Sequence, residues 1–82
     1  MANDELRKRA HDLDATVRVG KRGIDAVVDE VDDQLADRDM VKVKFLRAAR
    51  AGTTVEDLAV DLADRVDAEV FRTRGNTAVL RR

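Results

Sequence analysis

The chain has 82 residues, with 16 Lys and Arg, 17 Asp and Glu and one His, so its formal net charge is −1. It has no cysteine and no long apolar run, which excludes disulfides, thiolate metal sites and a membrane-spanning helix. A chain this short buries roughly 60% of its unfolded surface, so an enclosed catalytic cavity is hard to build. We expect one domain over residues 1–82, in the cytoplasm and away from the membrane.

Charge is sorted along the chain. Residues 24–39 carry seven acidic groups and one basic group, whereas residues 40–52 carry four basic groups and no acidic one. Residues 53–69 and 70–82 repeat this contrast, with six acidic groups against one basic group, then four basic groups against none. A positive face and a negative back are therefore possible despite the small net charge. The alternative is that acidic helices and basic strands merely neutralise each other.

The first predicted element is a helix over residues 3–14, with Asn3 or Asp4 as its N-cap. Leu6, Ala10 and Leu13 form a narrow apolar stripe. The remaining surface carries a basic cluster: Arg7, Lys8, Arg9 and His11. A solvated helix face and a contact with RNA explain this cluster equally well. One histidine without a partner motif makes neither a metal site nor a catalytic triad.

A strand over residues 16–19 leads into the loop Gly20-Lys21-Arg22-Gly23, and a helix over residues 24–37 follows. Glycine allows a sharp turn and a close approach of a ligand to the backbone. The first N–H groups of a helix lack partners and carry partial positive charge, so this junction favours an anion. Lys21 and Arg22 add two cations, and KH domains clamp a nucleotide backbone with a glycine-bounded loop. The alternative is an ordinary turn with two solvated cations, and the tetrapeptide alone favours that alternative.

The helix over residues 24–37 has a strong apolar stripe, with its acidic residues on the opposite, solvated face. A second strand over residues 40–46 alternates apolar residues with Lys42 and Lys44, and a flexible basic connection follows it. Thr53 and Glu56 predict a capping box for a third helix. Strands over residues 69–74 and 77–81 close the chain, joined by a two-residue turn at Gly75-Asn76.

The order α-β-α-β-α-β-β predicts an α/β (α+β) fold, in which helices pack on a four-stranded mixed sheet. We expect parallel pairing across each helical crossover and an antiparallel final hairpin. Basic side chains occupy the non-core positions of the strands: Arg18, Lys42, Lys44, Arg72 and Arg74. If Phe71 points into the core, one face of the sheet is basic. The sequence leaves open whether the first helix covers part of that face.

On these residues the chain resembles the YhbY-like, single-domain members of the chloroplast RNA splicing and ribosome maturation (CRM) domain family. The resemblance rests on the Gly20-Lys21-Arg22-Gly23 loop after Val17-Arg18-Val19, on Met40-Val41-Lys42-Val43-Lys44-Phe45, and on the closing hairpin from Val70 to Leu80. It covers nearly the whole chain. It departs from the family at Arg81, where many members carry an aromatic residue, and over residues 47–54, which lack the acidic residues common there.

This resemblance implies a sheet similar to that of the C-terminal domain of translation initiation factor 3, and RNA as the ligand. It implies association with precursors of the large ribosomal subunit in prokaryotes and makes the glycine-bounded loop the RNA contact. The leading hypothesis is therefore a protein that binds ribosomal RNA, with contacts to ribosomal proteins also possible.

Two alternatives remain open. One is an Alba-like chromatin protein that binds nucleic acid with little sequence preference. The other is a protein–protein adapter that uses the acidic helices. An enzyme is not expected, because the sequence shows no nucleophile–base pair, no metal cluster and no phosphate-binding P-loop, and we expect no cofactor. With two Phe and no Trp or Tyr, base stacking is disfavoured, so phosphates and helical shape are the expected contacts.

Overall fold

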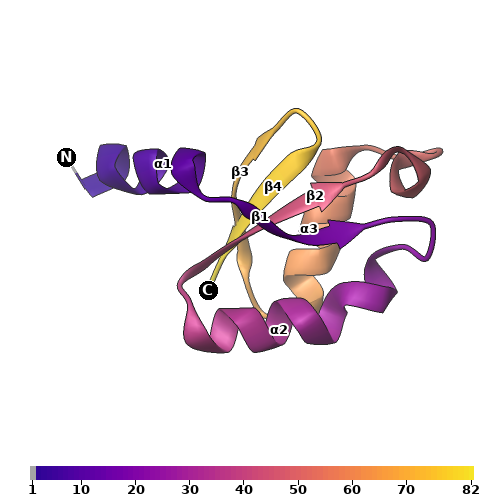
Figure 1. Cartoon of the computed structure of the whole chain (residues 1–82), viewed down its shortest axis with the longest axis horizontal. Coiled ribbons are helices and arrows are strands. Elements are labelled where there is room, and N and C mark those ends of the chain that lie inside the picture. Colours follow the sequence, from indigo (N-terminus) through magenta and orange to yellow (C-terminus); the bar gives the residue numbers. More distant parts are fainter. Residues whose placement is uncertain (1) are drawn as a thin grey trace.

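The computed structural model describes residues 2–82, and their side chains from residue 4 onward. Its elements follow the predicted order, with two short 3-10 helices (η) added (Figure 1). In chain order they are α1 (Ala2–Asp12), β1 (Ala15–Val19), η1 (Ile24–Val27), α2 (Val28–Asp37), β2 (Met40–Phe45), η2 (Arg47–Arg50), α3 (Val55–Arg65), β3 (Glu69–Arg74) and β4 (Thr77–Arg81). None of the helices in the described part of the chain is long and apolar enough to cross a membrane.

The four strands form one mixed sheet in the order β1-β2-β4-β3. β1 and β2 are parallel, and β4 is antiparallel to both β2 and β3. The predicted parallel pairing across a helix is confirmed for β1 and β2 but wrong for β2 and β3, because β4 lies between them. The physical reason is burial. Three consecutive residues of β4 are buried, whereas β3 is nowhere fully buried, so the more apolar strand takes the interior position.

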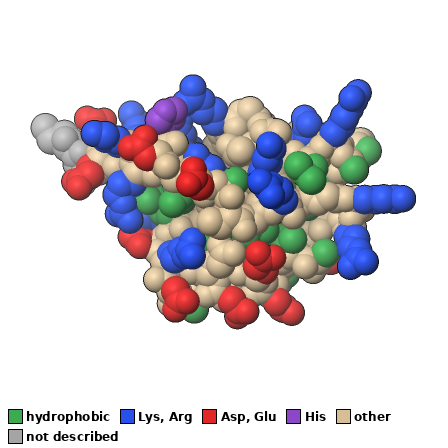
Figure 2. Space-filling view, in the orientation of Figure 1, with side chains coloured by type: hydrophobic (Ala, Val, Ile, Leu, Met, Phe, Trp, Pro, Cys, Tyr) green, Lys and Arg blue, Asp and Glu red, His purple; other side chains and the backbone are tan. Residues whose placement is uncertain are grey.

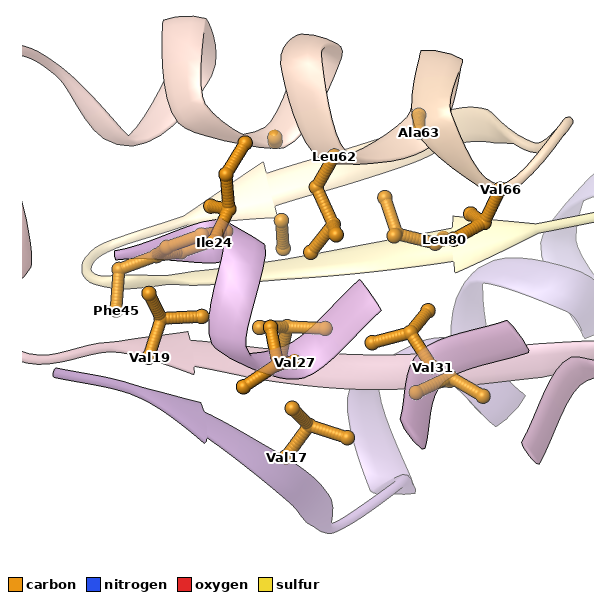
Figure 3. Packing of buried hydrophobic residues seen from close by; sticks show 14 of the residues in the cluster. Val17, Val19, Ile24, Val27, Val31, Phe45, Leu62, Ala63, Val66 and Leu80 are labelled. Carbon is orange, nitrogen blue, oxygen red and sulfur yellow. The ribbon is translucent and has the colours of Figure 1, made fainter. Parts of the chain in front are cut away.

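The main hydrophobic core lies between one face of the sheet and the helices η1, α2 and α3 (Figure 3). The sheet contributes alternate residues, as the strand patterns predict: Val17, Val19, Val41, Val43, Phe45, Ala78 and Leu80. The helices contribute the apolar stripes: Ile24, Val27, Val31, Leu35, Val55, Ala59, Leu62, Ala63 and Val66. This core fixes which side of each strand faces away from the helices.

A second, smaller core lies on the opposite face of the sheet, beneath α1. Ala10, Met40 and Val79 are buried there, and Leu6, Leu13 and Phe71 pack around them. The condition stated for a basic face, that Phe71 points into the main core, is therefore not met. The pairing of β3 with β4 is irregular between Val70 and Arg72, so that Phe71 and Arg72 both lie on the α1 side. α1 thus covers part of the face that was expected to be basic.

Polar contacts also hold α1 on the sheet. Arg9 pairs with Asp39 at 3.2 Å between the guanidinium and the carboxylate. A hydrogen bond from the backbone N–H of Asp39 to its own carboxylate, and then the Arg9 guanidinium, lower the pKa of this carboxyl below its usual value. Lys42 Nζ donates to the backbone carbonyl of His11 at 3.3 Å. The first bond joins the C-terminal part of α1 to the turn that precedes β2, and the second joins it to β2 itself.

The N-terminus of α3 differs from the prediction by one residue. Thr54, and not Thr53, is the N-cap, and its Oγ1 accepts a hydrogen bond from the Asp57 backbone N–H at 3.1 Å. The threonine-to-acid spacing of three residues recurs at Thr54 and Asp57, so the sequence offers two overlapping capping signals. α1 also begins earlier than predicted, at Ala2, so Asp4 lies in its first turn and is not the cap. The Asn3 side chain lies outside the described side chains.

We expect Thr54→Ala to lower the free energy of unfolding by about 1 kcal/mol, because the N–H of Asp57 loses its acceptor. For a domain of this size, that loss lowers the melting temperature by roughly 4–8 °C. Thr53→Ala is the matched control and should change stability by less than about 0.5 kcal/mol. Thermal unfolding followed by circular dichroism measures both. An equal loss in the two variants would contradict the assignment of the cap.

Candidate nucleic-acid interface

The glycine-bounded loop is a tight turn that projects two cations. The backbone N–H of Gly23 donates to the carbonyl of Gly20 at 3.0 Å, which closes the turn, and the side chains of Lys21 and Arg22 are exposed. Gly23 has φ +78° and ψ −176°, a conformation that is essentially restricted to glycine. Gly20 has no such requirement, and a Cβ there would lie 3.8 Å from Leu46 Cδ1, an ordinary contact. Only the second glycine is therefore required by the backbone.

The helix after the loop does not begin as predicted. η1 is a single 3-10 turn, in which the Ala26 N–H donates to the Gly23 carbonyl at 3.4 Å, and α2 starts only at Val28. The helix dipole acts mainly within the first turn of an α-helix, so α2 lies too far along the chain to act on a ligand at the loop tip. The expected contribution of an α-helix N-terminus is thus not present, and the two cations remain.

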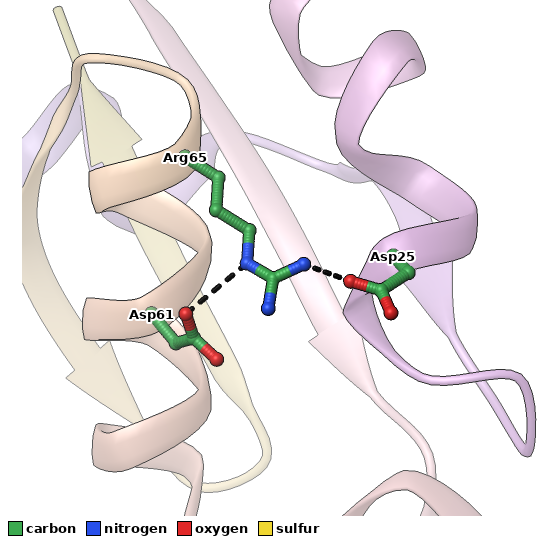
Figure 4. Close-up of polar contacts among 3 residues, drawn as sticks. All are labelled: Asp25, Asp61 and Arg65. Atoms are coloured by element: carbon green, nitrogen blue, oxygen red, sulfur yellow. Dashed lines mark hydrogen bonds and ion pairs between the residues drawn. The ribbon is translucent and has the colours of Figure 1, made fainter.

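Side chains behind the loop fix the direction in which η1 leaves it. Arg65 on α3 donates from Nε to Asp61 Oδ1 at 3.2 Å and forms an ion pair with Asp25 on η1 (Figure 4). Asp25 and Asp61 therefore have a structural role in the solvated acidic surface, as the sequence predicts for the acidic faces.

Three loops meet at the end of the sheet where β1 and β2 stop. The Leu46 N–H donates to the Val19 carbonyl at 2.8 Å, and the Phe45 N–H donates to the Asn76 carbonyl at 2.7 Å. These bonds place the glycine-bounded loop, η2 and the β3–β4 hairpin beside one another. The basic connection predicted to be flexible is the 3-10 helix η2.

This arrangement adds Arg47 and Arg50 to the site, which sequence reasoning did not include. The Nε of Arg50 is buried and has no hydrogen-bond partner among the described residues. Leu46 is 37% exposed between η2 and Gly20. A sequence signal existed: parallel strands end at the same edge of a sheet, so the basic residues after β2 had to lie near the loop after β1.

The five basic strand residues occupy one face of the sheet. In the strand register, Arg18 on β1 pairs with Lys44 on β2. Lys44 pairs with Thr77 on β4, and Thr77 pairs with Arg74 on β3. In the next row, Lys42 faces Val79, which faces Arg72. Val79 belongs to the small core beneath α1, so both rows lie on the face opposite the main core. Arg72 and Arg74 reach this face because the irregularity at Phe71 shifts the alternation of β3.

These cations are available for an anion. Within the part of the chain that the structure describes, none of Arg18, Lys42, Lys44, Arg72 and Arg74 forms an ion pair with a carboxylate. Figure 2 shows Lys and Arg side chains projecting at the loop end of the molecule, and Asp and Glu side chains along the edge formed by α2. The two signs of charge are thus separated between the loop end and the α2 edge, whereas both signs lie together over α1.

The whole described chain, residues 2–82, matches the family model of the CRS1 / YhbY (CRM) domain. The chain belongs to this family. The YhbY-like assignment and the α/β fold with its four-stranded mixed sheet are therefore confirmed.

Two relatives are similar to this CRM domain. A probable RNA-binding protein of Methanocaldococcus jannaschii is 42% identical over 75 residues, which are 92% of this chain and 56% of the relative. The chain thus spans little more than half the length of that curated relative. The solution structure of a hypothetical protein from Staphylococcus aureus, proposed to bind RNA, superposes with a TM-score of 0.77 at 28% identity. That match covers 98% of this chain and 82% of the other.

The conformation of the loop predicts different costs for its two glycines. Gly23→Ala should lower the free energy of unfolding by about 1–3 kcal/mol, because alanine is strained at the φ and ψ of this position. Gly20→Ala is the matched control and should change stability by less than about 0.5 kcal/mol, since its new methyl group meets only Leu46. Urea unfolding measures both variants. Similar losses would show that the turn does not depend on the positive φ of Gly23.

Proposed function

We propose that this CRM domain binds RNA through the loop Gly20-Lys21-Arg22-Gly23 and the basic sheet face. The observation that carries the proposal is the set of five cations on one face, which have no carboxylate partner among the described side chains, next to a turn that projects two more. Family membership and the names of the relatives support the choice of RNA over other polyanions. Arg47 and Arg50 extend the same surface at the end of the sheet.

Binding proceeds through phosphates and shape rather than through base stacking. Phe45 is fully buried in the main core and cannot stack on a base, and Phe71 is half-buried beside α1, so the surface offers no row of exposed rings among the described residues. Lys and Arg donors that follow the backbone of a folded RNA fit this surface better than a reader of single-stranded bases does. The ligand we propose is ribosomal RNA in precursors of the large subunit, in a prokaryotic cytoplasm. The acidic helices α2 and α3 on the other side of the sheet would face ribosomal proteins.

A folded ribosomal RNA fragment should bind more tightly than duplex DNA of equal length, as measured by fluorescence anisotropy. The affinity for RNA should fall with salt, with a log–log slope of about −0.7 to −0.9 for each phosphate contacted. Equal or tighter binding of DNA would contradict the proposal and favour an Alba-like protein. No RNA binding, with tight binding of a ribosomal protein, would favour an adapter.

Lys21→Glu combined with Arg22→Glu should weaken RNA binding by about tenfold for each cation removed, because each loses a charged hydrogen bond to a phosphate. Stability should change by less than about 0.5 kcal/mol, since both side chains are exposed.

Single variants give a matched comparison for the loop. Arg38 is also exposed but lies between α2 and β2, at the opposite end of the sheet. Arg38→Glu changes the net charge as much as Arg22→Glu does, so a purely global charge effect would weaken binding equally in both. Parental affinity in the loop variants would remove the loop from the proposed site.

A further inference from the structure

α1 and the basic sheet face enclose a small pocket between them. It is lined by Ala10, His11, Lys42, Arg72, Arg74, Thr77 and Val79. These residues come from one helix and three strands, so the pocket exists only while α1 is docked. Val79 and Ala10 are buried and form its apolar floor. The pocket is part of the larger basic face, but α1 covers one side of it, whereas the rest of the face is not enclosed in this way.

The pocket is rich in donors and poor in acceptors. Three of its seven lining residues are cations, and none carries a carboxylate. Arg74 NH1 lies 2.8 Å from His11 Nδ1. Because a guanidinium can only donate, this hydrogen bond requires Nδ1 as the acceptor, with the ring proton on Nε2. This bond also fixes the imidazole against β3.

Much of the donor capacity around the pocket is not used. Lys42 has three N–H groups and gives one to the His11 carbonyl. Arg74 gives one of its five to His11. The Arg72 side chain has no hydrogen-bond partner among the described residues.

Like charges are held close together around this pocket. Arg72 and Arg74 are two residues apart on β3, which corresponds to roughly 7 Å between their Cα atoms, and Lys42 is two strands away from Arg72, roughly 10 Å. Their side chains converge on a single cavity of about 20 Å³. Concentrating three cations in this way is unfavourable without an anion between them. A cavity of this size has room for about one water-sized atom and not for a whole phosphate group.

We propose that this pocket receives one nonbridging oxygen of a phosphodiester in the RNA backbone, with the phosphorus at the pocket mouth. The proposal rests on the proposed RNA binding and adds α1 to the binding site. Lys42, Arg72 and Arg74 donate to the oxygen from the sheet. His11 positions Arg74 by accepting its hydrogen bond. α1 therefore completes a phosphate site on the face that it partly covers.

The single histidine of the chain provides a direct probe. In the proton NMR spectrum of the full chain, the His11 ring signal should shift when a ribosomal RNA hairpin is added, and the shift should saturate with the overall affinity. Dimethyl phosphate, a phosphodiester without bases or sugars, should shift the same signal at millimolar concentration and beyond the effect of sodium chloride at equal ionic strength. Inorganic phosphate should shift it at least as strongly, because it offers the same kind of oxygen with at least as much negative charge. No response to dimethyl phosphate beyond that to sodium chloride would overturn the assignment of a phosphate oxygen to this pocket.

Arg72→Ala removes a lining cation that forms no hydrogen bond or ion pair with the described side chains of α1, so α1 should remain docked and the free spectrum of His11 should be retained. RNA affinity should fall about tenfold. The log–log salt slope should become less steep by at most about 0.7–0.9, the share of one phosphate, because Lys42 and Arg74 still contact it. Arg38→Ala, with the same loss of charge outside the pocket, is the matched control and should leave both quantities at the parental values.

The outcomes separate this inference from the proposed function. If RNA binds the parent but leaves the His11 signal unmoved, the pocket is not occupied and the inference is wrong, while RNA binding stands. If Arg72→Ala binds RNA like the parent, the inference is also wrong. If the parent binds no RNA, the proposed function fails, and a response to dimethyl phosphate would then still show an anion pocket beneath α1.

Discussion

The pairing of β2 with a neighbour on each side is the constraint on which the rest of the molecule depends. Its parallel register with β1 and antiparallel register with β4 turn Val41, Val43 and Phe45 toward the main core. The same register necessarily turns Lys42 and Lys44 to the other face, beside Arg18 and Thr77. A slip by one residue would exchange the two sets, placing lysines in the core. Burial of the apolar residues therefore holds the basic face in place, and no separate interaction is needed to form it.

The sequence predicts the face of the sheet that packs in the main core, because the residues of that face follow simple periodicity. The stripes of the two main helices and the alternation in β1 and β2 determine the main core, and the glycine-bounded loop follows from β1. The other side depends on events that periodicity does not encode. Phe71 changes sides at an irregularity in the pairing of β3 and β4, and α1 docks through a stripe of only three residues. Whether β3 or β4 lies beside β2 depends on how deeply each of the two strands is buried, and burial is a property of the whole fold.

Local chemistry at the loops is predicted less well than the strands. Thr53 and Thr54 are each followed three residues later by an acid, so the sequence alone does not choose between the two caps. An apolar stripe from Ile24 is compatible with a 3-10 turn as well as an α-helical one, and the difference decides whether a helix dipole reaches the loop. Arg47 and Arg50 join the site only through the bond from Leu46 to Val19, a contact between segments distant in the chain.

A chain with net charge −1 can present a binding surface for a polyanion because its carboxylates pair with cations outside the two basic rows. Carboxylates engage Arg7, Arg9, Arg65, Arg81 and Arg82, and none of the ion pairs among the described residues includes a cation of the two basic rows. The helices α2 and α3 pack on the opposite face of the sheet, so their outer acidic faces are separated from the basic face by the main core and the sheet. At physiological salt the Debye length is about 8 Å, and the acidic back is largely screened from a ligand on the sheet. The local set of unpaired cations, and not the summed charge, then determines the attraction.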